Sequence, residues 1–261
     1  MTAGTHVVLT DSIDDIDTSD QLTMASAFQK AFIANGSNLK VADFINTKLT
    51  LAEFTVAPTR GSTIVQAGST AEMIVDFVNG GLTEIYGYTT TGTFTTTAGQ
   101  TLSGGSFASD NSKVPTGVDA NPHWYDWTEY GVTQAASTNM PAKAYLVGVY
   151  RGRLVLAGNP RYPNQWYMSY VANPFNFTYG KDTPMSAVAG NNADAGQCPD
   201  IVRSLISFHD DYLIFGCAST IWILRGDPVA GGSLDNLSDT TGMFGSNSWC
   251  FDDNRNLYFW G

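Results

Sequence analysis

A repeated pattern of short apolar runs and turns in the second half of the chain limits what this sequence can fold into. Its first copy begins with the run 144–150, which is rich in β-branched and aromatic residues. Arg151-Gly152-Arg153 is a turn signal, the run 154–157 follows, and Gly158 closes it. After a loop that contains two prolines, residues 165–171 form a third run. Such runs between turn residues predict consecutive β-strands.

Two further copies of this pattern occupy residues 201–228 and 248–261. Phe208 stands where Tyr150 stood, and eight residues separate each of these aromatics from the glycine that closes its second strand. The closing glycines at 158, 216 and 261 are 58 and 45 residues apart. Propeller blades repeat at roughly 40–50 residues, so the spacing matches with one insertion.

We therefore predict an all-β fold with propeller-like antiparallel blades and an inserted small β-barrel or sandwich domain. Stacking small sheets face to face around an axis buries faces that one sheet alone leaves exposed. An ordinary β-sandwich or barrel with coincidental spacing is the alternative. Composition divides the chain into an acidic N-terminal arm (1–20), a blade-like β-segment (21–56), an inserted small β-domain (57–107), an aromatic linker (108–141) and blade-like repeats (142–261).

Local signals place further elements within the first half. Residues 22–31 permit a short helix, whereas Asn35-Gly36 is a strong turn signal between strands. The expected strands around that turn are 32–34, 39–44 and 49–54. In the glycine-punctuated inserted domain, the expected strands are 63–66, 71–78, 83–88 and 93–97.

The aromatic linker carries His123, Trp124, Tyr125, Trp127 and Tyr130. Trp and Tyr in such a segment anchor a loop across a core or a subunit interface. Aromatics interleaved with polar residues also suit stacking against a sugar or a base. Both interpretations remain open, with anchoring favoured.

Composition narrows the possible partners. Only 14% of the residues are charged, and the net charge is −11 with no basic cluster, so a protein that grips DNA phosphates is disfavoured. An acidic surface past which DNA slides is compatible with this charge. No apolar run is long enough to span a membrane, and the N-terminus lacks the pattern of a secretory signal, so we expect assembly in a cytoplasm.

The sequence offers no catalytic, cofactor-binding or metal site, and we predict a non-enzymatic protein. No GxSxG, HExxH or phosphate-loop signature occurs. A calcium loop that starts at Asp15 fails at its sixth and twelfth positions, Asp20 and Ser26. The turn His209-Asp210-Asp211 is more simply a solvated hairpin turn than a metal site. Among the three cysteines, Cys198 belongs to no CxxC pair, and Cys217 and Cys250 lie in apolar runs and are expected to be buried.

Several short motifs resemble tail and neck structural proteins of tailed bacteriophages. They are the strand pair 150–158 (YRGRLVLAG), the element 166–169 (WYMS), the element 174–177 (PFNF) and the glycine-punctuated stretch 92–104 (GTFTTTAGQTLSG). The resemblance covers about residues 30–50 and 90–261. It implies the fold of tail-nozzle proteins, which is a propeller with added β-domains arranged as a ring around the DNA channel.

The expected function is that of a structural virion component at the tail or the head–tail junction. It would form a homo-oligomeric ring with an acidic inner face, contact other tail or neck proteins, and let genomic DNA pass without specific binding. We expect a neighbouring subunit to cover the apolar strand 257–260. The runner-up is a carbohydrate-binding module that uses residues 124–130, and a hydrolase ranks third because propellers commonly host hydrolases.

Overall fold

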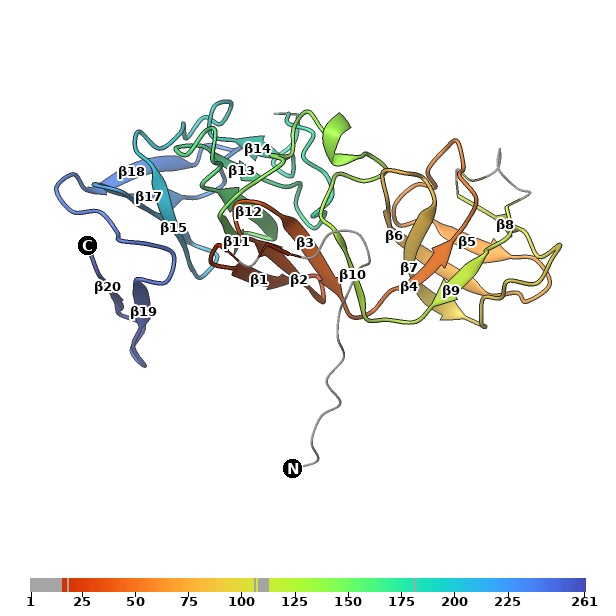
Figure 1. Ribbon diagram of the computed structural model, residues 1–261. Helices are drawn as coiled ribbons and strands as arrows, with labels where there is room; N and C mark the ends of the chain where they lie inside the picture. The colour runs from red at the N-terminus through yellow and green to blue at the C-terminus, as the bar shows by residue number, and fades with distance from the viewer. Residues whose placement is uncertain (1–15, 18, 106, 108–112, 181) are drawn as a thin grey trace. The chain divides into compact units, whose positions relative to one another are not determined.

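The computed structural model describes residues 16–17, 19–105, 107, 113–180 and 182–261. The prediction of an all-β fold is confirmed, since strands account for 40% of the chain and helices for 2%. The chain forms two compact units, one containing Lys40–Ala136 and the other containing Asp17–Leu39 and Ser137–Gly261. We call them unit 1 and unit 2 and describe each by itself (Figure 1). No helix in the described part of the chain has the length and apolar character needed to cross a membrane.

Unit 1 is built on a six-stranded sheet that curls into a half-barrel (Figure 1). The strand order is β8-β5-β6-β7-β4-β9. The strands are β4 (Thr47–Thr50), β5 (Thr63–Gln66), β6 (Glu72–Val78), β7 (Glu84–Thr91), β8 (Leu102–Ser103) and β9 (Gly117–Asp119). The expected strands at 63–66, 71–78 and 83–88 are confirmed. The sheet reaches beyond the range 57–107, because β4 pairs with both β7 and β9.

The strand expected at 93–97 is wrong, and the side chain of Gln66 explains why. This side chain is fully buried. Its Oε1 accepts a hydrogen bond from the backbone N–H of Thr95 at 2.8 Å, and its Nε2 donates to the Thr95 carbonyl at 2.7 Å. One amide side chain thus satisfies the two backbone groups that a neighbouring strand would otherwise satisfy.

Two strands lie in the segment that was expected to be a linker. They are β9 and β10 (His123–Asp126), and β10 pairs antiparallel with β3 (Leu39–Asp43). Side chains alternate along a strand, so β10 buries His123 and Tyr125 while Asp126 is exposed. The hydroxyl of Tyr125 donates to the buried carboxylate of Asp43 at 3.0 Å.

Unit 2 contains two four-stranded antiparallel sheets and two hairpins (Figure 1). The first sheet has the order β11 (Leu146–Tyr150), β12 (Arg153–Ala157), β13 (Trp166–Met168), β14 (Val188–Ala189). The second has the order β15 (Val202–Phe208), β16 (Tyr212–Cys217), β17 (Ile221–Arg225), β18 (Ser233–Ser238). One hairpin, β1 (Thr23–Ala27) with β2 (Lys30–Ala34), is part of a further four-stranded sheet of order β1-β2-β3-β10, and the other, β19 (Trp249–Phe251) with β20 (Leu257–Phe259), is a separate two-stranded sheet.

The possible helix at 22–31 is wrong, because this segment forms the β1–β2 hairpin. Phe28 and Gln29 form its turn with φ of 52° and 58°. Two successive positive φ angles are typical of the tight turns that join antiparallel strands. The turn predicted at Asn35-Gly36 is confirmed, with Gly36 at a φ of 85°.

The sequence repeat corresponds to equivalent places in the two four-stranded sheets. Tyr150 is the last residue of β11, and Phe208 is the last residue of β15. A two-residue turn follows the first, and a three-residue turn follows the second. Gly158 comes just after its strand, whereas Gly216 lies inside β16.

The core of unit 2 lies between these two sheets. Its buried members come from both, including Trp166 from β13 and Phe215 from β16, whose ring centroids are 6.0 Å apart. β12 has β11 on one side and β13 on the other, so the predicted interior position of the strand around Leu154 is confirmed. β11 in turn packs against β1 and β15, the first strands of their own sheets.

Candidate functional site

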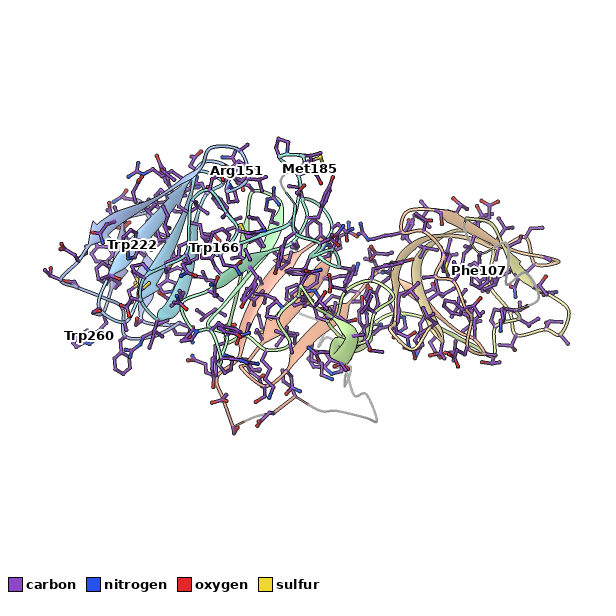
Figure 2. All side chains as sticks on the ribbon, turned by 90° about the horizontal axis from the view of Figure 1, so that it is seen from above. Phe107, Arg151, Trp166, Met185, Trp222 and Trp260 are labelled. Atoms are coloured by element: carbon purple, nitrogen blue, oxygen red, sulfur yellow. The ribbon has the colours of Figure 1, made fainter. Side chains whose placement is uncertain are left out.

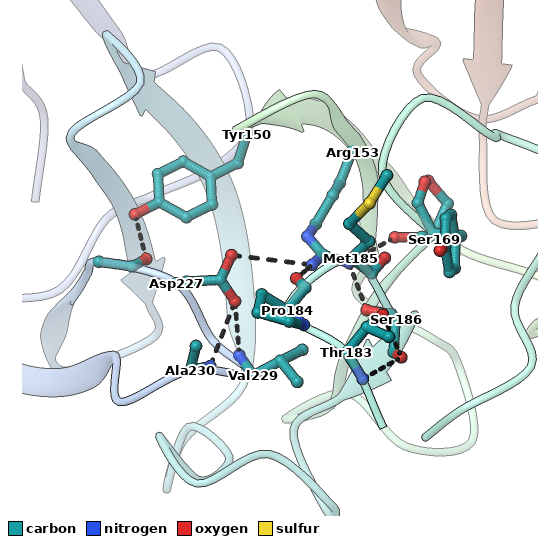
Figure 3. A network of polar contacts seen from close by, with 12 residues as sticks. Tyr150, Arg153, Ser169, Thr183, Pro184, Met185, Ser186, Asp227, Val229 and Ala230 are labelled. Atoms are coloured by element: carbon teal, nitrogen blue, oxygen red, sulfur yellow. Dashed lines mark hydrogen bonds and ion pairs between the residues drawn. The ribbon is translucent and has the colours of Figure 1, made fainter. Parts of the chain in front are cut away.

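A buried polar network in unit 2 surrounds Arg153, the first residue of β12 (Figure 3). Its side chain is fully buried. Nη1 donates to the carbonyls of Ser169 at 3.0 Å and Met185 at 3.2 Å, and to that of Ser186. Nη2 donates to the carbonyl of Pro184. Four carbonyls of one loop thus converge on a single guanidinium, whose planar fork suits several acceptors at once.

The same guanidinium reaches the second sheet. Arg153 Nη2 lies 3.8 Å from a carboxylate oxygen of Asp227, in the loop after β17. Asp227 is held in place because its other oxygen accepts the backbone N–H of Val229 at 2.8 Å. Burial lowers the pKa of Arg153, and the nearby carboxylate of Asp227 opposes that shift. The charge therefore has a partner, which a buried charge needs.

Tyr150 makes a second connection between the sheets. Its buried side chain donates a hydrogen bond from the hydroxyl to the carbonyl of Gly226 at 2.8 Å, and the carbonyl of Asp211 lies 3.2 Å away (Figure 3). Burial raises the pKa of Tyr150, so this hydroxyl stays a donor at neutral pH. β11 and the hairpin loops of the second sheet are joined in this way.

Several residues of the motifs 166–169 and 174–177 are also buried. Ser169 Oγ accepts the backbone N–H of Leu154 at 3.0 Å. Trp166, Phe175 and Phe177 are at most 1% exposed, and the ring of Phe175 lies 6.3 Å from that of Phe32. The motifs 150–158, 166–169 and 174–177 therefore contribute large side chains to packing and hydrogen bonding inside unit 2, whereas the stretch 92–104 lies in unit 1.

The aromatic residues 123–130 mostly face the interior of unit 1. Trp127 is fully buried, Tyr125 is 4% exposed, and the Tyr125 ring stacks on Phe77 with centroids 4.9 Å apart. The Tyr130 hydroxyl donates to the carbonyl of Pro58. A sugar cannot stack on rings that protein atoms already cover, so this geometry favours the anchoring interpretation.

The hairpin turn at His209 places the imidazole beside an arginine and not beside further metal ligands. His209 has a φ of 56°, and its Nε2 lies 2.6 Å from Nη1 of Arg255. Asp210 and Asp211 are exposed. In the described part of the chain, no three His, Cys, Asp or Glu side chains are grouped so as to hold a metal ion. Asp15, where the calcium loop would start, and His6 lie outside the described residues.

All three cysteines are free thiols. Cys198 and Cys217 are fully buried, and the hydrogen bond between their thiols together with burial raises the pKa of Cys198. The expectation that Cys250 is buried is wrong, since it is exposed. The neighbouring Trp249 packs against the core cluster around Ile206, and alternation along β19 turns Cys250 to the opposite, uncovered face.

Exposed aromatic side chains gather near the last hairpin. Phe244 is 74% exposed, Tyr258 56%, Phe259 41% and Trp260 75%. Backbone hydrogen bonds from Phe244 to Trp260 and from Trp260 to Ser248 hold these segments together. In Figure 2, Trp260 lies at the margin of unit 2, whereas Trp166 is enclosed by strands. We call residues 244 and 258–260 the C-terminal aromatic surface, and sequence reasoning located its strand but not Phe244.

The described side chains therefore offer two kinds of feature: an internal network that joins sheets, and an exposed aromatic surface. Neither contains a nucleophile with a neighbouring base. Comparison of the chain with protein-family models and with curated protein sequences finds no match.

Proposed function

We propose that this protein is a structural, non-enzymatic component of a bacteriophage virion, at the tail or the head–tail junction, where copies assemble into a ring around the DNA channel. The observation that carries the proposal is the packing of β11 against both β1 and β15. Each is the first strand of its sheet or hairpin, and neighbouring first strands are what propeller blades present around their axis. Two of the phage-like motifs, 150–158 and 166–169, lie mainly within the sheet that contains β11.

The C-terminal aromatic surface supports the assembly part of the proposal. Large exposed apolar patches on folded proteins are commonly contact sites. Tyr and Trp dominate the energetics of such contacts, and charged residues are depleted at their centres. This surface fits a second copy of the chain, and closed rings form when one patch meets a different patch at a rotation that closes.

The channel part of the proposal rests on charge. The net charge of −11 allows a wall rich in carboxylates, which repel DNA phosphates and keep passing DNA from sticking. The ring would serve as a conduit and not as a DNA-binding site.

Electron microscopy and mass spectrometry of purified particles test this function. The expected result is a ring of copies at the tail or neck, with Asp and Glu along the channel. Absence of the chain from particles, its occurrence as single copies or isolated spikes, or a channel lined by Lys and Arg contradicts the proposal.

A test with the isolated chain uses the double variant Phe259→Ser/Trp260→Ser and sedimentation velocity. We expect the wild-type chain to self-associate and the double variant to remain monomeric. Tyr88→Ser is the matched control, because Tyr88 is 55% exposed in unit 1. Self-association that survives the double variant shows that another surface joins the copies.

A further inference from the structure

A separate cavity in unit 2 has the chemistry of a ligand site. Its volume is about 770 Å³. Small-molecule sites usually measure about 300–1,000 Å³. Its walls come from the segment before β11 (residues 137–142), the loop between β12 and β13 (159–165) and residues 191–192 after β14, with Tyr167 and Tyr179.

The lining is polar, aromatic and nearly uncharged. Five amide side chains and three tyrosines contribute: Asn139, Asn159, Gln165, Asn191, Asn192, Tyr162, Tyr167 and Tyr179. Arg161 is the one charged residue among the described residues that line it. Amides and hydroxyls both donate and accept hydrogen bonds. A lining of this kind matches an uncharged ligand with many hydroxyl groups better than a cation or a polyphosphate.

Hydrogen bonds within the walls preform this cavity. Asn159 Oδ1 accepts the backbone N–H of Arg161 at 2.8 Å, Asn192 Oδ1 accepts that of Ala189 at 2.8 Å, and the Tyr179 hydroxyl donates to the Asn139 carbonyl at 2.7 Å. These bonds fix loops from three parts of the chain. A preformed site binds more tightly because less ordering is needed on binding.

Other groups are left for a ligand. Gln165 Oε1 is buried without a hydrogen-bond partner in the described structure, although Gln165 Nε2 donates to Gln197. A buried acceptor without a partner is costly, so turning of the Gln165 amide toward a ligand hydroxyl in the cavity is favoured. The exposed side chain of Asn191 makes no hydrogen bond to the described residues.

Tyr162 supplies the aromatic surface. It is 49% exposed, and the Arg161 guanidinium lies 5.4 Å from its ring centroid. The negative π face of an aromatic ring attracts positively polarised hydrogens, such as the C–H groups on one face of a pyranose. Aromatic rings beside amide groups thus serve the two sides of a sugar, its apolar face and its hydroxyl edge.

We propose that this cavity binds a saccharide, with Tyr162 contacting the apolar face of a sugar ring and Gln165 and Asn191 bonding to its hydroxyls. The inference does not depend on the function proposed above. It assigns saccharide binding to unit 2, far along the sequence from the aromatic residues 124–130.

Saturation-transfer NMR and calorimetry with the full chain test the site against four probes: cellobiose, maltose, N,N′-diacetylchitobiose and digalacturonic acid. We expect at least one probe to bind. Tyr162→Ala should weaken that binding by about tenfold, a loss typical of one aromatic contact. Gln165→Ala and Asn191→Ala should each weaken it by about three- to tenfold, as expected for one hydrogen bond.

Tyr88→Ala is the matched control, because Tyr88 is a similarly exposed tyrosine of unit 1 and should leave binding unchanged. Thermal melting of each variant confirms that it is folded, and Tyr162→Phe, which keeps the ring, should bind nearly as well as the wild type. Arg161→Gln separates two ligand types, since it should weaken an acidic sugar selectively and leave neutral sugars unaffected. Binding of no probe, or binding unchanged in both Tyr162→Ala and Gln165→Ala, overturns the inference.

Discussion

The guanidinium of Arg153 and the carboxylate of Asp227 come from different sheets of unit 2 and lie 3.8 Å apart (Figure 3). Arg153 is completely buried, whereas the Asp227 side chain is 21% exposed. The pair joins β12 to the loop after β17, while the same guanidinium binds four carbonyls of the loop that precedes β14. One side chain therefore organises the contact between two sheets and a long loop.

Replacing Arg153 with Met should destabilise unit 2 by about 3–5 kcal/mol, because buried carbonyls lose their donors and Asp227 loses its counter-charge. Arg153→Lys should be nearly as destabilising as Arg153→Met, because an ammonium group lacks the planar fork of the guanidinium. Urea titration of the free energy of unfolding measures both. Arg203→Met, at an exposed site on β15, is the control. A loss below about 1 kcal/mol for Arg153→Met contradicts the assigned role.

Leu154→Asp should also destabilise severely, by about 3–5 kcal/mol, because it places a carboxylate at a fully buried position in an interior strand. Leu237→Asp makes the same chemical change on β18, where the side chain is 50% exposed, and should cost little. Thermal melting compares the two. Equal melting shifts in these variants rule out the strand register described for β12.

Gly36→Ala should lower the free energy of unfolding more than Gly196→Ala does, although both glycines have a φ above 80°. Both variants carry the strain of a left-handed residue, about 1–2 kcal/mol. An added Cβ at Gly36 meets the Tyr145 ring at 2.2 Å, whereas nothing lies within 4 Å of one at Gly196. The extra cost of overpacking is about 1–3 kcal/mol. In a double-mutant cycle, removing the ring with Tyr145→Ala should abolish this overpacking cost of Gly36→Ala. If the effects of Gly36→Ala and Tyr145→Ala on the free energy of unfolding are additive, the two residues do not contact each other in this way.

The stability of unit 1 should fall as the pH is lowered from about 7 to 5 through the ordinary His pKa. Burial lowers the pKa of His123, with smaller opposing effects from Asp43 and Asp119 and a further lowering from Lys48. The unfolded chain therefore binds a proton that the folded chain excludes, so the free energy of unfolding rises with pH in this range.

His123→Phe should flatten this pH profile while keeping a ring opposite Tyr86, whose centroid is 5.5 Å from that of His123. Hydrogen bonds from Ser19 and Asn256 lower the pKa values of Asp17 and Asp252, so these carboxylates titrate below the measured range. Urea titrations at pH 7 and pH 5 give the result. An unchanged slope in the variant assigns the effect to another group.

Interpretation of the sequence succeeded where the signal was local. Turn residues and β-branched runs located β5, β6, β12 and β16 closely, because a tight turn and an extended strand depend on neighbouring residues. It failed at 93–97, where the buried side chain of Gln66 takes the place of a strand. The candidate saccharide cavity was also missed, since its amides come from loops that carry no shared motif.

The sequence by itself determined an all-β chain, its tight turns and the eight-residue spacing that makes Tyr150 and Phe208 equivalent. Only the tertiary structure decided that β4 pairs with β9, that Trp127 is covered and that Cys250 is exposed. Backbone pairing and burial depend on partners far away in the sequence. A strand with the same alternating sequence can therefore have a buried face or an exposed one, and the packing of another element against it decides which.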